Sequence, residues 1–438
     1  MIKKTYWFLG LIWVFSGSLA AQESSPNLSI KQLINSAIEN NYLLQANEKN
    51  VLIKQAEIEI LKANYQPKIS TSANFSYWKF LLPNKQKLLG DNGLTDMYTD
   101  ISIYQTIYDW GENKLKKEII EDEIKLNDDI KRQIRNTIIW GVYDAYFEAL
   151  KIESEIAALQ NAAKQLKSHL QYATNLYKIG RVSNIDVLKI NLQIAVEEKN
   201  LKKAQNQFLS QEIKIRSLCH LGNDKSFEIE NTSQTLYNDS KNTLFANDSI
   251  FSAVILNHPA LLAASRKITM EDKQKDIYGL QNRPELFSYG IGSWEHAYIP
   301  FGDNFNYNFG LGIRYTLPYW GGSGYKSNIV KSNIRATQMN DEKNQLFTDL
   351  KKEIDLELNT ISDIKTEIAN NEKIIALAEE TLNNALIKYQ AGLGPVIDVL
   401  DAQTILTETS IARQKSIITF LQALGSLQYL TGNDNYIF

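Results

Sequence analysis

The chain has 438 residues, of which 44% are hydrophobic and 22% charged, a balance typical of folded proteins that excludes a disordered or collagen-like chain. Its 47 basic and 50 acidic side chains give a net charge of -3, which leaves no positive surplus for a broad nucleic-acid surface. The single cysteine excludes an intramolecular disulfide, and four histidines are few for a zinc or haem centre. We therefore expect no nucleic-acid partner, no metal and no cofactor.

The first 20 residues have the pattern of a secretory signal peptide. Lys3 and Lys4 precede an apolar core, and Ser18-Leu19-Ala20 supplies a signal peptidase site. The apolar stretch is short for a membrane anchor, and no cysteine follows the cleavage site to accept a lipid. We expect export with a mature chain that starts near Ala21, and an uncleaved anchor is the alternative.

The chain also contains an internal repeat. Tyr177–Leu188 returns as Tyr389–Leu400, and both segments read Y-x-x-G-x-x-x-x-I-D-V-L without a gap. Two earlier landmarks recur in the same order at a similar spacing: Pro67 with Pro284, and Trp110-Gly111 with Trp320-Gly321. We interpret these matches as the duplication of a unit of about 210 residues.

The sequence pattern of each repeat predicts a helix, two strands and a long helical hairpin, in that order. The first helix should run without a break from a capping box at Ser29 and Gln32 to Tyr65. Long helices are expected because no proline lies between Pro83 and Pro259. At 1.5 Å per residue, a helix over 113–178 would be roughly 100 Å long.

The predicted organisation has five parts. Residues 1–20 are the signal peptide, and residues 222–247 link the two repeats. The first repeat spans 21–221 with strands at 68–80 and 98–110, the second spans 248–431 with strands at 285–297 and 305–317, and 432–438 form a tail.

The strands predict contact with lipid. Each has an apolar and a polar side, which suits hairpins on a soluble core or strands in a membrane. Segments of this length cross a bilayer when tilted, and tryptophans near their ends are typical of aromatic belts at lipid headgroups. These tryptophans are Trp78, Trp110, Trp294 and Trp320. Four strands cannot close a barrel, so three chains would supply twelve.

The expected fold class is therefore mostly α with a transmembrane β part. Long antiparallel helical hairpins would form an α-barrel tube beneath a 12-stranded trimeric β-barrel. With this plan, and above all with Y-x-x-G-x-x-x-x-I-D-V-L-D-A at Tyr389–Ala402, the chain resembles the TolC-like outer-membrane efflux proteins. The resemblance implies a homotrimer in outer-membrane lipid with a long periplasmic extension. It also implies docking on a periplasmic adaptor protein and an inner-membrane transporter.

The resemblance further implies roles for the hairpin tips, although glycine caps and a solvated acidic surface are the simpler interpretation. The adaptor-facing residues would be Gly180, Arg181, Gly392 and Leu393. The gate residues would be Asp186, Tyr389, Asp398 and Asp401. Asp398 and Asp401 share a helix face, so six carboxylates on a threefold axis would favour cations. Gly394 occupies the position of the family's gate arginine, which predicts a weaker or differently wired gate.

Two other classes of protein explain less of the sequence. A periplasmic or surface coiled-coil scaffold accounts for the long helices and not for the two-sided strands. An enzyme is disfavoured because no nucleophile motif, phosphate loop or metal-ligand cluster accompanies the carboxylates. The function that the resemblance implies is a passive exit duct of a tripartite efflux or type I secretion system, with substrate selection by the pump partner.

Overall fold

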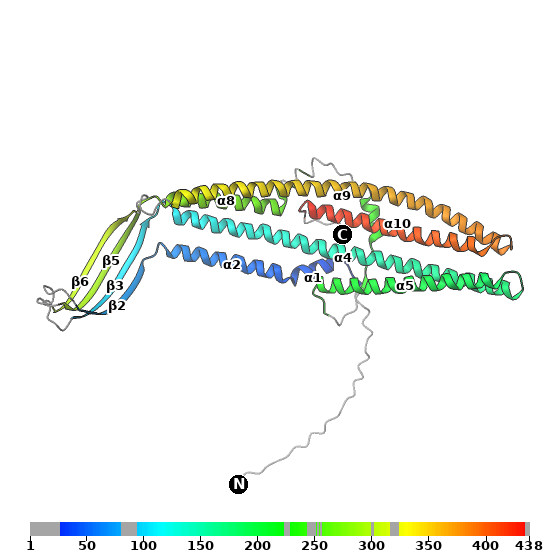
Figure 1. Cartoon of the computed structure of the whole chain (residues 1–438), viewed down its shortest axis with the longest axis horizontal. Helices are drawn as coiled ribbons and strands as arrows, with labels where there is room; N and C mark the ends of the chain where they lie inside the picture. Colours follow the sequence, from blue (N-terminus) through cyan, green and yellow to red (C-terminus); the bar gives the residue numbers. More distant parts are fainter. Residues whose placement is uncertain are drawn as a thin grey trace, which may run out of the picture.

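The computed structural model combines one sheet with long helices that extend away from it (Figure 1). It describes residues 27–79, 94–222, 228–242, 251, 254, 256–298, 302–315 and 324–433. The predicted signal peptide and Trp320 lie outside these ranges. None of the helices within them combines the length and the hydropathy that a membrane span requires.

The first half begins with two helices where the sequence predicted one. α1 (Ile30–Glu39) starts at the expected capping box, in which Ser29 and Gln32 each accept a hydrogen bond from the other's backbone N–H. The side chain of Asn41 then accepts hydrogen bonds from the backbone N–H groups of Leu43 and Leu44, the second and third residues of α2 (Tyr42–Ala63). The expectation of one unbroken helix is wrong because this second cap interrupts it.

Two long helical hairpins run along the molecule. α4 (Glu112–Lys178) and α9 (Gly324–Gln390) each have 67 residues, whereas α5 (Asn184–Leu218) and α10 (Val396–Leu430) each have 35. α8 (Pro259–Leu280) has 22 residues, like α2. Near the sheet the packing order is α2, α4, α8, α9, and towards the hairpin tips it is α5, α4, α10, α9 (Figure 1). The chain is therefore a layer whose edge helices are α2 and α5 on one side and α9 on the other.

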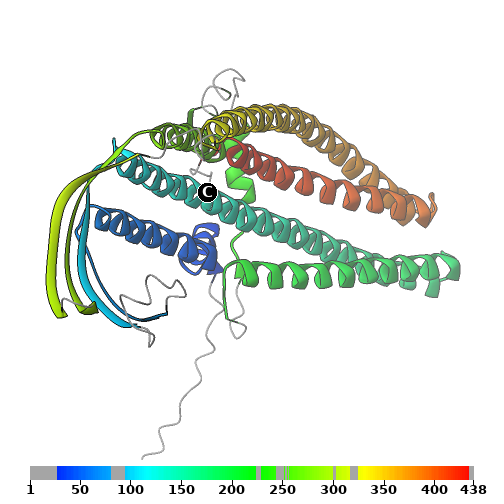
Figure 2. The same ribbon diagram turned by 60° about the vertical axis from the view of Figure 1, so that its left-hand side comes forward.

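The four long strands form one antiparallel sheet in the order β2-β3-β5-β6. The strands are β2 (Lys68–Trp78), β3 (Leu94–Tyr108), β5 (Glu285–Tyr298) and β6 (Gly302–Arg314). All four lie at the predicted places, within four residues at either end. Pairing of β3 with β5 joins the two halves of the chain, and Figure 2 shows that the sheet is curved.

A small element joins the halves at mid-length. β1 (Asn27–Leu28) pairs in parallel with β4 (Glu228–Ile229), and α6 (Ser233–Ser240) packs against α10. β4 and α6 lie within the predicted linker, which therefore contains regular structure.

The main hydrophobic core lies where α1, α4, α9 and α10 meet. Tyr143 is fully buried there, and its hydroxyl donates a 3.0 Å hydrogen bond to the carbonyl of Leu421. Gly425 makes room for the ring, because a Cβ at that position would lie 2.3 Å from Tyr143 Cε1. The close approach of α4 and α10 thus depends on this glycine.

We expect Gly425→Ala to lower the free energy of unfolding by about 1–3 kcal/mol, because the added methyl overpacks the ring of Tyr143. Gly141→Ala is the matched control within α4, where an added Cβ meets no atom within 4 Å. It should raise stability by up to about 1 kcal/mol. Thermal unfolding in detergent, followed by circular dichroism, measures both, and equal midpoints would contradict this packing.

Candidate functional site

One face of the sheet is apolar and exposed. Directly opposed residues in a ladder share a face, so Ile69, Ile103, Gly290 and Phe309 lie on one side across all four strands. The large side chains exposed on this face are Ile69, Phe75, Tyr77, Met97, Ile101, Ile103, Trp294, Phe305, Tyr307, Phe309, Leu311 and Ile313. Phe309 is 78% exposed. No described part of the chain covers this outer face.

The opposite face is mostly polar. Its described residues include Ser70, Ser72, Asn74, Asp100, Ser102, Thr106, Asn306, Asn308 and Arg314. The hydroxyls of Ser70 and Ser102 lie 2.7 Å apart across the ladder, and Ser72 donates to Asp100. The sheet thus has one face suited to lipid and one suited to water.

In β5, bulky apolar side chains point to the opposite face of the sheet from those of its neighbours. Its bulky residues Phe287 and Tyr289 lie on the polar face, opposite Gly312 and Gly310. A Cβ at Gly312 would lie 2.4 Å from the ring of Phe287, so the two aromatic rings occupy the space that the glycines leave. The predicted alternation in β5 is present, and its apolar side faces the opposite way from that of β6.

The predicted membrane-interface tryptophans are only partly described. Trp78 ends β2, but its side chain lies outside the described part of the chain, as does Trp320. Trp294 is 51% exposed on the outer face, towards the end of the sheet away from the helices. Trp110 follows β3 at the helical end, and its indole Nε1 donates a 2.6 Å hydrogen bond to the carbonyl of Pro284.

Both hairpin tips have the same backbone geometry. Gly180 and Gly392 adopt the left-handed conformation with φ of 74° and 72°, as the sequence predicted. The next N–H groups, those of Arg181 and Leu393, each donate a 2.9 Å hydrogen bond back into the preceding helix. Arg181 is exposed, and Leu393 is 82% exposed. The four predicted adaptor-facing residues therefore lie together at one end of the molecule.

The predicted gate residues occupy two different environments. Tyr389 is 5% exposed in a hydrophobic cluster that joins both hairpins through residues such as Leu176 and Val399. Burial, and then the negative charge of Asp186, raise the pKa of Tyr389, yet its hydroxyl has no hydrogen-bond partner within the described structure. The chain thus brings Asp186 near Tyr389 without a direct link. Asp398 and Asp401 are exposed at the start of α10.

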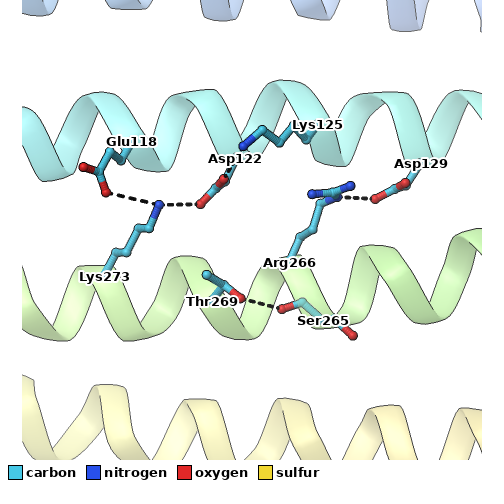
Figure 3. A network of polar contacts seen from close by, with 8 residues as sticks. All are labelled: Glu118, Asp122, Lys125, Asp129, Ser265, Arg266, Thr269 and Lys273. Atoms are coloured by element: carbon cyan, nitrogen blue, oxygen red, sulfur yellow. Dashed lines mark hydrogen bonds and ion pairs between the residues drawn. The ribbon is translucent and has the colours of Figure 1, made fainter. Parts of the chain in front are cut away.

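A polar network that the sequence analysis missed fastens α8 to α4 (Figure 3). Lys273 Nζ lies 2.7 Å from Asp122 and 3.3 Å from Glu118, and Arg266 binds the buried carboxylate of Asp129. Burial acts to raise the pKa of Asp122, but hydrogen bonds from Lys273 and Lys125 outweigh it and hold that pKa below its usual range. The sequence signal for this network is a matching spacing: the two acids, Asp122 and Asp129, are seven residues apart, and so are their basic partners.

The comparisons with known proteins give one family match, over part of the chain. The sequence profile of the outer membrane efflux proteins matches residues 33–219. This part of the chain, less than half of the 438 residues, is similar to that family. No curated protein sequence matches the chain. Within the described residues, no group of three His, Cys, Asp or Glu side chains could hold a metal ion.

Solved structures share the fold of this chain at low sequence identity. CusC has a TM-score of 0.79 at 15% identity and covers 93% of each chain. VceC of Vibrio cholerae has a TM-score of 0.74 at 17% identity, covering 92% of this chain and 96% of its own. The MtrE outer membrane channel of Neisseria gonorrhoeae has a TM-score of 0.73 at 15% identity, covering 92% and 89%.

We expect Tyr389→Phe to leave the free energy of unfolding unchanged or to raise it by up to about 1 kcal/mol, because it removes a buried hydroxyl without a partner. Tyr389→Ala, which leaves a cavity in the cluster at the tips, should cost about 3–5 kcal/mol. Thermal unfolding of both variants measures these changes. A clear loss of stability in the Phe variant would contradict this expectation and show that the hydroxyl is hydrogen-bonded in the assembled protein.

Proposed function

We propose that three copies of the chain form a passive exit duct through the outer membrane and the periplasm. An inner-membrane transporter supplies the substrate, a periplasmic adaptor protein connects the two, and the hairpin tips gate the entrance. The observation that carries this proposal is the sheet, which has an exposed apolar face and two unpaired edge strands.

The open edges of the sheet support closure with further copies. β2 and β6 are the edge strands, and they run in opposite directions because neighbouring strands alternate. β6 of one copy can therefore pair antiparallel with β2 of the next. In lipid each unpaired N–H or C=O group costs several kcal/mol, so an open edge is not tolerated. Three copies supply twelve strands, an even number that closes a barrel around the polar face.

The helical edges support the same arrangement. α5 exposes Ile185, Leu188, Leu192, Leu209 and Ile213, and α9 exposes Val330, Ile334, Leu356, Leu377 and Ile387. Extended apolar surfaces of this kind mark interfaces between chains. Because α5 and α9 lie on opposite edges, one copy can cover the exposed α5 of the next with its own α9. A coiled-coil scaffold would need this helical contact, but it leaves the outer face of the sheet unexplained.

The proposal assigns roles to the residues at both ends of the duct. At the tips, Asp398 and Asp401 favour cations near the axis, and Asp186 and Tyr389 contribute to the closed gate. Gly180, Arg181, Gly392 and Leu393 meet the adaptor. At the membrane, the four tryptophans named above lie at the lipid headgroups.

Purification from detergent-extracted outer membranes tests the assembly and the channel together. We expect a particle with about three times the protein mass of one chain, and ion-conducting channels in planar bilayers. A monomer that forms no channels would refute the duct.

A pair of substitutions on β6 tests which face meets lipid. Leu311 is 73% exposed on the outer face, so Leu311→Arg should cost about 2–4 kcal/mol in the bilayer and reduce the assembled trimer. Asn308→Arg on the polar face is the matched control and should assemble normally. Outer-membrane yield and the heat-sensitive trimer band on gels measure both variants. Normal assembly of Leu311→Arg would place this face outside the membrane.

A further inference from the structure

The polar face of the sheet carries positive charge at the end that joins the helices. Arg314 is the last residue of β6 and Lys68 the first of β2, and the register places both on the polar face. Both line one hollow of about 590 Å³ together with Lys116 and Arg283. The carboxylates lining this hollow are Asp109, Glu112 and Glu285, so the cations outnumber them by one.

The carboxylates are largely engaged by other groups. Asp109 accepts hydrogen bonds from the backbone N–H groups of Gly111 and Asn113, which begin α4. Glu112 lies 2.6 Å from Lys116. Glu285 accepts from Thr106 Oγ1 at 2.8 Å and from the hydroxyl of Tyr104 at 3.2 Å. These bonds occupy the acceptor oxygens of the carboxylates, and the lining as a whole keeps a surplus of one positive charge.

Arg314 is held in one orientation. Its Nη2 donates a 2.9 Å hydrogen bond to the hydroxyl of Tyr104, and its guanidinium lies over the rings of Tyr104 and Phe287, 5.3 and 5.0 Å from their centroids. Nη1 is 3.6 Å from Glu285, a looser contact. The Arg314 side chain remains 58% exposed. The guanidinium is therefore positioned and still accessible to a solute.

We propose that these residues, the neck cluster of Lys68, Tyr104, Glu285, Phe287 and Arg314, form a binding point for acidic solute groups where the barrel joins the helical tube. The inference rests on the proposed duct, because only closure of three copies turns the polar face into a bore. Three neck clusters then surround the axis, and walls of low dielectric strengthen their field. Carboxylate, sulfonate or phosphate groups of a passing solute pair with Arg314, and anions permeate more readily.

The two ends of the duct then have opposite charge preferences. Asp398 and Asp401 are acidic and exposed at the tips, and the neck cluster is cationic. The distance between them is most of the 67-residue length of α9, far beyond the screening length of about 8 Å in physiological salt. The two sites therefore act independently, and a change at the neck alters selectivity without altering the tips.

The test is the chloride-to-potassium permeability ratio of the full protein, from reversal potentials in planar bilayers under a KCl gradient. Arg314→Gln should lower this ratio about two- to threefold, because the bore loses three positive charges. Glu285→Gln should raise it, because it frees Arg314 from its counter-charge. Arg314→Lys keeps the charge and should restore at least half of the loss.

The outcomes separate the two proposals. If the wild-type protein forms no channels, the duct itself is refuted. If channels of normal conductance keep the wild-type ratio in both Arg314→Gln and Glu285→Gln, the duct stands and the neck cluster is refuted. If Arg314→Gln fails to assemble, Lys68→Gln is measured in its place and should also lower the permeability ratio. An unchanged ratio in both Lys68→Gln and Glu285→Gln overturns the inference.

Discussion

The structure depends on a backbone constraint, namely that hydrogen-bonding groups cannot stay unpaired in lipid. The chain presents β2 and β6 as unpaired edges of a sheet whose outer face is apolar. In water such edges could be solvated, but in a bilayer they must find other strands. The exposed apolar residues on α5 and α9 impose a parallel demand on the helical part. In the proposed duct a closed ring of copies would meet both demands at once, so the sheet and the tube would share one symmetry.

Within one chain, different contacts join the helices at three levels between the sheet and the hairpin tips. Near the sheet the ion pairs of Lys273 and Arg266 join α8 to α4. At mid-length the buried aromatic core around Tyr143 joins α4 to α10, and at the tips the cluster around Tyr389 joins the two hairpins. Any motion that separates the hairpins at the tips must expose this last cluster to water. In the proposed duct, opening a gate at this end would work against this apolar contact.

Much of the fold could be predicted because its signals are local. Alternation located all four strands, and Gly180 and Gly392 marked helix ends. The break at Asn41 was missed because the apolar spacing continues across it. The reversal of β5 could not be predicted, since alternation defines two sides of a strand and only the register decides which side joins its neighbour's. The ion pairs of Lys273 and Arg266 depend on how α8 packs on α4. The seven-residue spacing of these charges indicates such a contact only once the partner helix is known.

The distribution of side-chain size on the polar face determines where a closed barrel could select its solutes. Along β2 and β6 the described residues on this face are mainly Ser, Asn and Gly, which leave a bore wide. Bulky rings on this face come from the central strands: Tyr98 lies nearer the end away from the helices, and Phe287, Tyr289 and Tyr104 lie towards the helical end, where Arg314 stacks on two of them. Selection requires close contact between solute and wall, because charge in a wide aqueous bore is screened. Where Arg314 stacks on the rings of Tyr104 and Phe287, bulk and positive charge coincide, so a closed barrel would sense the size and the charge of a solute at the same level there.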